Sequence, residues 1–282
     1  YAISNIGSIF GLISYPFLLE PNLSLQVQEK LWITLFVLFL VAYYYITSKL
    51  APSITNTKAQ TVKLDILSFT HWTILATISN IALISTTSNI TLSISPAPFL
   101  WLLPLILFLL SFILGFSQKI YQQSFHLGLL CYSIFIILAG YNNFLTYNRF
   151  WVNVGLLLFT QFMINFVCHA ELYKAKPKPN LLPQFYLSIA VGGVVATIFC
   201  ALFAPLIFND YYEFPVNLAL AIFLFLLVAI NNSKNWQQSA QFILISSVLF
   251  FLLITHVDRN YATSKNNTNN KSQNYNTYYP KI

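Results

Sequence analysis

Three polar residues recur at every fourth position in an otherwise apolar stretch. Gln161, Asn165 and His169 share one face of a helix because residues four apart lie one turn above each other, and Tyr173 continues the line. Amide groups both donate and accept hydrogen bonds, and imidazole exchanges a proton near neutral pH. Polar side chains at membrane depth often mark a pathway, so this stripe is the first candidate for handling a solute or an ion.

The same stripe also has a purely structural interpretation. Asn and Gln commonly form hydrogen bonds between helices in lipid, and a polar group near the membrane interface costs little. Glu171 extends the candidate set, but it lies two residues from His169, so the two side chains do not share a helix face. The spacing therefore does not support a catalytic His–Glu pair. Both interpretations of the stripe remain open.

Enzyme chemistry has no other candidate residues in this sequence. It contains no Ser–His–Asp set, no HExxH and no phosphate loop. Cys131, Cys168 and Cys200 lie in apolar stretches without paired spacing, which indicates small packing residues rather than ligands. We expect no catalytic activity, no metal site and no cofactor.

The helix that follows the stripe has a face built for close packing. A basic loop containing several prolines leads from Tyr173 into an apolar run in which small residues recur at every fourth position. Such rows let two helix backbones approach closely in lipid. One row is Ser188, Gly192, Ala196, Cys200 and Ala204, and the adjacent row is Ile189, Gly193, Thr197 and Ala201. The start of the chain has a similar small face at Gly7 and Gly11.

Composition explains why these residues should lie in lipid. Of 282 residues, 57% are hydrophobic and only 7% are charged, whereas soluble domains carry about 25% charged residues. Apolar runs of about 18 residues or more recur along the chain, enough to cross about 30 Å of hydrocarbon. We predict an all-α, polytopic transmembrane bundle. The net charge of +7 suits cytoplasmic loops and anionic lipid, and no clustered basic and aromatic surface indicates nucleic acid.

We predict about nine spans, followed by a polar tail over 257–282 that is rich in Asn and Ser and is interpreted as disorder or a truncated linker. The transmembrane domain is therefore 1–256. The expected spans are Ala2–Leu19, Leu31–Tyr45, Phe69–Ser88, Phe99–Phe116, His126–Gly140, Val152–His169, Leu182–Phe208, Val216–Ile230 and Ala240–Thr255.

The lysines predict which side of the membrane each loop occupies. Loops after even-numbered spans hold eight lysines, namely Lys49, Lys58, Lys63, Lys119, Lys174, Lys176, Lys178 and Lys234. Loops after odd-numbered spans hold only Lys30 and Arg149. The positive-inside rule makes the first set cytoplasmic. Nine full crossings would then put the basic tail on the side of the membrane opposite the cytoplasm. Either one span is therefore re-entrant or the number of spans is not nine. Because the chain opens on Tyr1 directly in a helix, we also expect it to be an excerpt of a longer protein.

Three segments resemble the membrane region of fused major-facilitator/spermidine-synthase-like proteins. They are YAISNIGSIFGLISYPFLLEPNLSLQ, then PAPFLWLLPLILFLLSFIL, then VCHAEL…PQFYLSIAVGGV…APLIF…YEFP, in that order within Tyr1–Pro215. In that family, a transmembrane region of major-facilitator type precedes a cytoplasmic domain similar to polyamine aminopropyltransferases. The resemblance implies a partly major-facilitator-like bundle in a bacterial inner membrane or, alternatively, an organelle inner membrane.

The sequence also departs from that family. Ser93 stands where the family typically has an Asp, and the Gly-rich turn of a nucleoside-binding domain is missing, since the one Gly-Gly pair lies in an apolar helix. Every acid lies at or beyond a span end, so a deep site for a polyamine lacks the carboxylates it would need.

Two kinds of function follow from these features. The first is a membrane anchor, assembly module or accessory subunit, whose partners are the lipid bilayer and other membrane helices. The alternative is a transporter-like bundle for a small solute, with a cavity lined by the spans around Asn165 and Gly192. A water-filled cavity touching Asn165 would favour transport, and a dry helix contact there would favour assembly.

Overall fold

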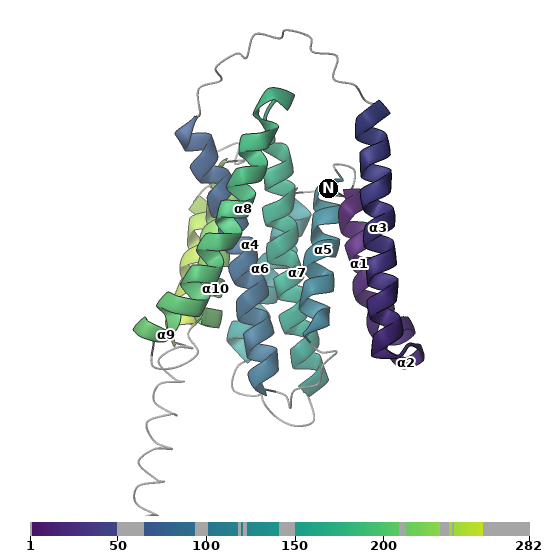
Figure 1. The fold of residues 1–282 in the computed structure, drawn as a ribbon. Coiled ribbons are helices and arrows are strands. Elements are labelled where there is room, and N and C mark those ends of the chain that lie inside the picture. Colours follow the sequence, from purple (N-terminus) through teal and green to yellow (C-terminus); the bar gives the residue numbers. More distant parts are fainter. Residues whose placement is uncertain are drawn as a thin grey trace, which may run out of the picture.

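The computed structural model describes residues 2–49, 65–93, 101–117, 120, 123–140, 150–208, 213–231, 237–238 and 240–255, and within these ranges the chain is helical, with no strand. The all-α bundle predicted from the sequence is confirmed (Figure 1). The principal helices are α1 (Ala2–Ser14), α3 (Leu25–Lys49), α4 (Ile66–Ser93), α5 (Leu102–Gly115), α6 (Gln123–Gly140), α7 (Phe150–Lys174), α8 (Leu182–Ile198) and α10 (Glu213–Asn231). The predicted tail lies outside the described residues.

Five of the described helices are long and apolar enough to cross a membrane: Ile3–Asn22, Leu25–Lys49, Ile66–Thr91, Trp151–Lys174 and Pro179–Ile207. The shorter apolar helices Leu102–Gly115, His126–Leu138, Phe214–Ile230 and Ala240–Thr255 lie at the other expected spans. These lengths and compositions identify a membrane protein, while crossing by each shorter helix stays a prediction.

The centre of the bundle is formed by α4, α5 and α7, and α8 lies on the outer side of α4. Hydrogen bonds pair Pro104 with Gln161 and Ser111 with His169, so α5 and α7 run parallel. Trp72 pairs with Ala175, just past the end of α7. Ser79, about two turns further along α4, pairs with Asn165 and His169, which lie earlier in the chain. Helix α4 is therefore antiparallel to α7. The loops before α4 and after α7 consequently share one end of the bundle.

Two of the apolar helices are interrupted by a π-helical turn beside a proline. The turn Tyr15–Leu19 contains Pro16, and the turn Phe199–Phe203 precedes α9 (Ala204–Ile207) with its Pro205. Proline lacks the N–H that would continue an α-helix, and a π turn is one way a helix accommodates that loss. The first and seventh spans thus change direction near their ends without a loop.

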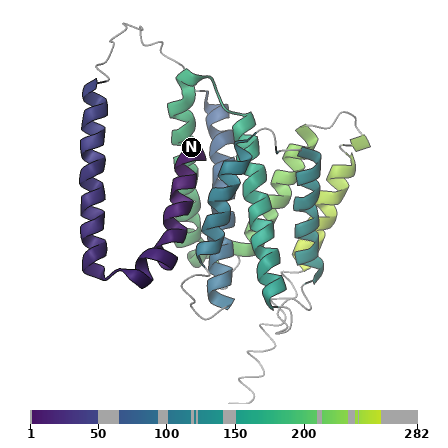
Figure 2. The ribbon, with the colours of Figure 1, turned by 90° about the vertical axis from the view of Figure 1, so that its right-hand side faces the viewer.

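The α1–α3 hairpin forms the outer edge of the molecule (Figure 2). Helix α1 packs on α5, and α2 (Glu20–Asn22) turns the chain into α3, on the side of α1 away from α5. All side chains of α3 are exposed except that of Gln28, which is half-buried. A helix that is apolar on every side needs lipid or a protein neighbour around it.

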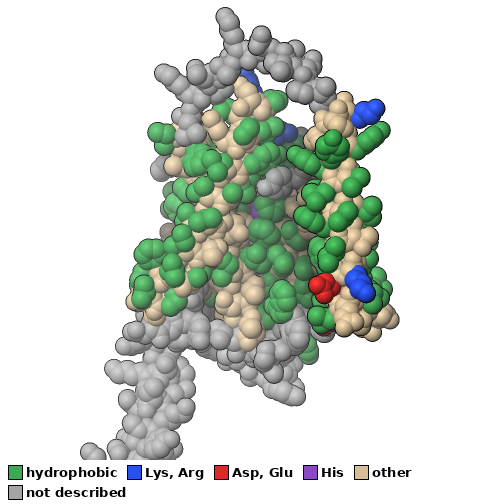
Figure 3. Space-filling view, viewed as in Figure 1, with side chains coloured by type: hydrophobic (Ala, Val, Ile, Leu, Met, Phe, Trp, Pro, Cys, Tyr) green, Lys and Arg blue, Asp and Glu red, His purple; other side chains and the backbone are tan. Residues whose placement is uncertain are grey.

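Charged side chains gather at the helix ends. In Figure 3, apolar side chains cover much of the visible faces of α3 and α8, and the visible basic and acidic side chains lie toward the two ends of the helices. This distribution suits a hydrocarbon layer across the middle of the bundle, because a charged group in hydrocarbon is costly.

Candidate functional site

His169 lies at the centre of a polar cluster that joins three helices. Its Nε2 is 3.0 Å from Ser79 Oγ on α4, and its Nδ1 is 2.9 Å from Ser111 Oγ on α5. Ser79 Oγ also lies 3.2 Å from Asn165 Oδ1, one turn earlier on α7. We call these four residues the His169 cluster. All four are at most 1% exposed.

Aromatic rings enclose the imidazole. The Phe112 ring stacks on it with centroids 3.5 Å apart and planes 22° apart, and the Phe108 ring stands edge-on with centroids at 5.2 Å. Gly115 lets α5 approach on the same side, since a Cβ there would lie 2.9 Å from His169 Cβ and 3.1 Å from the Ala170 nitrogen. The imidazole is therefore held by packing and by hydrogen bonds together.

Gln161 joins α5 and α7 about two turns before His169. Its Nε2 donates to the Pro104 carbonyl oxygen of α5 at 2.9 Å, and the side chain is 1% exposed. Within the described residues, Gln161 Oε1 and Asn165 Nδ2 have no hydrogen-bond partner. The three residues of the predicted stripe thus all lie inside the bundle, against α4 or α5.

The remaining predicted residues of α7 lie at its end, away from the cluster. The Glu171 carboxylate is 2.9 Å from Lys174 Nζ, and the Tyr173 ring packs on Phe116 with centroids at 5.3 Å. Lys176 Nζ lies 4.2 Å from the centroid of the Tyr173 ring. Glu171 therefore forms an ion pair with Lys174 near the helix terminus, two residues past His169.

A serine hydroxyl beside an imidazole resembles a catalytic nucleophile with its general base, and Ser79 and His169 form such a pair. A nucleophile must meet its substrate, and the Ser79 side chain is fully buried. Each ring nitrogen of His169 faces a hydroxyl rather than a carboxylate. The arrangement links α4, α5 and α7 through hydrogen bonds.

Sequence reasoning missed Ser79 and Ser111, the two residues that connect His169 to its neighbours. Ser111 is the one serine of the apolar run Leu102–Gly115, whereas Ser79 is one of many hydroxyl residues in α4, and other serines such as Ser133 also lie in apolar runs. Ser133 instead bonds the Leu130 carbonyl of its own helix. Only the packing of α4, α5 and α7 distinguishes them.

The first small-residue row of α8 lies against α4. Ser188, Gly192, Ala196, Cys200 and Ala204 are all buried. A Cβ added at Gly192 would lie 2.6 Å from Ala76 Cβ and 2.8 Å from the Thr73 carbonyl oxygen. Thr77 Oγ1 donates to the Gly192 carbonyl at 3.3 Å across the same contact. The second row is buried only at Ile189 and turns outward after it, since a Cβ at Gly193 would meet only the Asn80 side chain, at 3.8 Å, and Thr197 and Ala201 are exposed.

The small face of α1 lies opposite α5, on the side of α3, and makes no close contact there. The buried or half-buried positions of α1 and its π turn are Asn5, Ile9, Leu12 and Pro16 among others, whereas Gly7 and Gly11 are exposed. At 100° per residue, Gly7 lies about half a turn around the helix from Asn5 and Ile9. A Cβ added at Gly7 or Gly11 would meet nothing within 4 Å.

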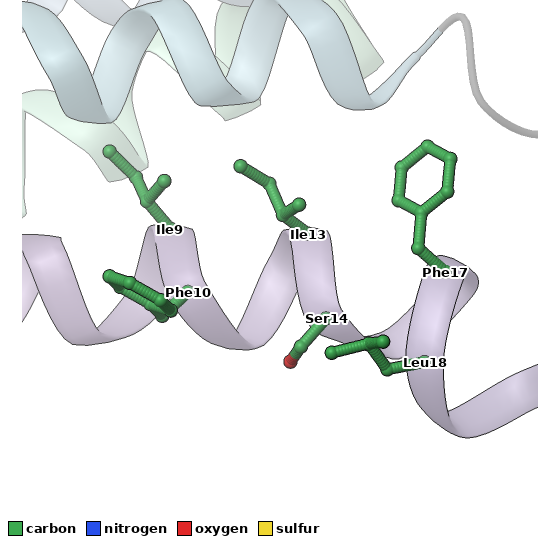
Figure 4. A pocket seen from close by; sticks show the side chains of 6 residues that line it. All are labelled: Ile9, Phe10, Ile13, Ser14, Phe17 and Leu18. Atoms are coloured by element: carbon green, nitrogen blue, oxygen red, sulfur yellow. The ribbon is translucent and has the colours of Figure 1, made fainter.

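A shallow apolar hollow follows the surface of the same hairpin (Figure 4). Ile9, Ile13 and Phe17 point toward a neighbouring helix, whereas Ser14 points to the other side. The remaining lining residues are Phe10 and Leu18. No charged or metal-ligating side chain lines this hollow, and the described residues contain no cluster of three or more His, Cys, Asp or Glu that could hold a metal ion.

Comparison with known proteins finds no similar protein. No protein-family model, curated protein or solved structure matches this chain.

Proposed function

We propose that this chain is a membrane-embedded assembly module, which anchors a larger protein or joins a membrane complex through its α1–α3 edge. The observation that carries the proposal is the open face of α1. Gly7 and Gly11 are spaced as small residues are at close helix contacts in lipid, yet the helix uses its opposite face to pack on α5.

Helix α3 supports the same conclusion. Its 25 residues are long enough to span a bilayer, and its side chains are almost wholly exposed. Together, α1 and α3 present two apolar helices whose faces lack protein cover in the described chain. A transmembrane helix of another subunit, or of the rest of a longer protein, fits such faces by its chemistry. The resemblance to fused spermidine-synthase-like proteins would make the chain an anchor for a downstream domain, and the bacterial inner membrane remains the proposed location.

Transport remains the alternative function, and the burial of Asn165 weighs against it. Asn165 is 0% exposed and Gln161 is 1% exposed, so neither side chain meets a water-filled path in this structure. A transporter can occlude its site in one state, however, which makes accessibility during turnover the relevant measurement.

The assembly proposal is tested by filling the small face of α1. Gly11→Leu places a bulky side chain where this chain offers open space, so its own fold should tolerate the change while a partner helix should be displaced. We expect the complex extracted from native membranes in mild detergent to shrink to the size of the single chain on native electrophoresis.

Gly155→Leu on α7 is the matched control, because a Cβ there also meets nothing within 4 Å. It should leave the size of the complex unchanged. A Gly11→Leu protein that keeps the size of the unmodified complex, or an unmodified protein that already migrates as a single chain, would refute the proposed role of α1.

Accessibility of position 165 tests the transport alternative. In a chain with Cys131, Cys168 and Cys200 replaced by alanine or serine, Asn165→Cys should resist a water-soluble thiol reagent in intact membranes, because the site is sealed by α4 and α5. Cysteine at exposed Thr197 lies on the outer face of α8 and controls for lipid shielding, while cysteine at exposed Asn22 controls for reagent activity. Labelling at position 165 would favour a water-filled path.

A further inference from the structure

The His169 cluster contains four polar contacts whose protons must be shared consistently. Ser79 Oγ contacts Asn165 Oδ1 and His169 Nε2, and Ser111 Oγ contacts His169 Nδ1 and the Phe108 carbonyl oxygen. Each hydroxyl carries one proton and a neutral imidazole carries one N–H. Asn165 contributes none while its carbonyl oxygen faces Ser79. Three protons therefore serve four contacts in the orientation shown.

The Phe108 contact determines the direction of the chain. Ser111 Oγ lies 2.6 Å from the Phe108 carbonyl oxygen, which can only accept. Two oxygens at this distance repel each other unless a proton lies between them, so Ser111 donates to Phe108. Ser111 must then accept from His169, which places the imidazole proton on Nδ1.

The remaining two contacts follow from that assignment. If Nδ1 carries the only N–H of a neutral imidazole, Nε2 accepts, and Ser79 is the donor at 3.0 Å. The Ser79 proton is then used, so the contact with Asn165 needs a proton from the amide. Turning the Asn165 amide by 180° provides it, because the amide oxygen and nitrogen have nearly the same shape and are distinguished by their hydrogen-bond partners. The Nδ2 group otherwise has no partner among the described residues.

A doubly protonated His169 would also supply a fourth proton, with Asn165 left as the acceptor. The groups that pack on the ring are hydroxyls and phenyl rings, and α5 has no charged residue. Helix α4 contains His71 but no acid or lysine, and on α7 the nearby charges are Glu171 and Lys174, which pair with each other. A buried cation without a carboxylate partner is costly, which favours the neutral ring.

We propose that the His169 cluster is a one-directional hydrogen-bond chain, running from the Asn165 amide N–H through Ser79, His169 and Ser111 to the Phe108 carbonyl oxygen. His169 is neutral and protonated on Nδ1, and Asn165 is the donor that completes the chain. The chain positions α7 against α4 and α5 in a single register. This proposal is independent of the partner proposed for α1.

Nitrogen NMR of the full chain tests the proposal. With ¹⁵N-labelled histidine in detergent micelles at neutral pH, the His169 signals are those lost in His169→Gln, since the chain has 4 histidines in all. We expect one ring, protonated at Nδ1 and unprotonated at Nε2. A ring protonated at Nε2 alone, at both nitrogens, or averaged between tautomers would overturn the proposal.

Two serine variants give a matched pair. Ser79→Ala removes the donor to Nε2 but leaves Ser111 as the acceptor for Nδ1–H, so the tautomer should persist. Ser111→Ala removes that acceptor, and the proton should move to Nε2, where Ser79 can accept it. The reverse pattern would show that the chain runs in the opposite direction, and the wild-type spectrum alone decides the question if either variant fails to fold.

Discussion

At Gly192, the absence of a single side-chain atom lets α8 approach α4 closely. A Cβ there would lie 2.6 Å from Ala76 Cβ, whereas a Cβ at the next residue, Gly193, would lie 3.8 Å from the nearest atoms of Asn80. The two glycines are adjacent in the same helix, so they share its backbone environment and differ in what they face. Gly192 is required for contact with α4, and Gly193 is not required for any contact described here.

This difference predicts opposite effects for one substitution. Gly192→Ala should lower the free energy of unfolding by about 1–3 kcal/mol, the usual cost of overpacking. Gly193→Ala should be neutral or stabilising by up to about 1 kcal/mol, because alanine favours a helix over glycine. Thermal unfolding of the two purified proteins in the same detergent measures both. Equal losses at the two positions would contradict the close contact of α8 with α4.

Among the elements, three helices meet at Trp72. The residue is 6% exposed near the start of α4, and its indole N–H donates to the Ala175 carbonyl oxygen, just past the end of α7, at 3.0 Å. Its ring stands edge-on to Phe185 near the start of α8, with centroids 5.2 Å apart. Carbonyls at a helix end lack partners within the helix, so Trp72 satisfies one of them while it fills the core.

Two replacements separate these roles. Trp72→Phe keeps an aromatic ring but removes the donor, which should cost about 1 kcal/mol of stability, plus a smaller packing loss. Trp72→Ala removes the ring as well and should cost about 3–5 kcal/mol. Urea or SDS titration of the purified chain, followed by circular dichroism, measures the loss of stability in each variant. If Trp72→Phe were as damaging as Trp72→Ala, the hydrogen bond rather than packing would dominate.

The positions of the helices could be predicted from the sequence, but their contacts could not. Long apolar runs identify α3, α4, α7 and α8, because lipid requires a continuous apolar segment with all backbone groups bonded. The packing face of α1 carries no comparable signal. The small residues Gly7 and Gly11 indicated one face, whereas the helix packs on α5 through the opposite face at Ile9, because both faces are compatible with lipid. Ser79 and Ser111 were missed for the same reason.

For the whole molecule, the distribution of charge predicts its orientation in the membrane. The ends of α3 and α7 and the starts of α4 and α8 lie together at one end of the bundle, which therefore holds Lys49, Lys174, Lys176 and Lys178 (Figure 1). The positive-inside rule places this end in the cytoplasm. The turn between α1 and α3, at Asn22, then lies on the opposite side.

Impermeant thiol labelling measures this orientation. In a chain without its native cysteines, Asn22→Cys should react when reagent is added outside intact cells, and Lys178→Cys should react only after the cells are opened. Both positions are exposed in the structure, so neither result depends on packing. The opposite pattern would invert the molecule and remove the basis for the cytoplasmic assignment of the basic loops.

The contact of α4 with α8 can form only after both helices have been synthesised. Thr77 and Gly192 are 115 residues apart in the chain, and a ribosome adds about 5–20 residues per second. Helix α4 must therefore remain in the bilayer for roughly 6–23 s before α8 emerges to cover it. During that interval the surface of α4 around Thr73, Ala76 and Thr77 has no α8 to cover it.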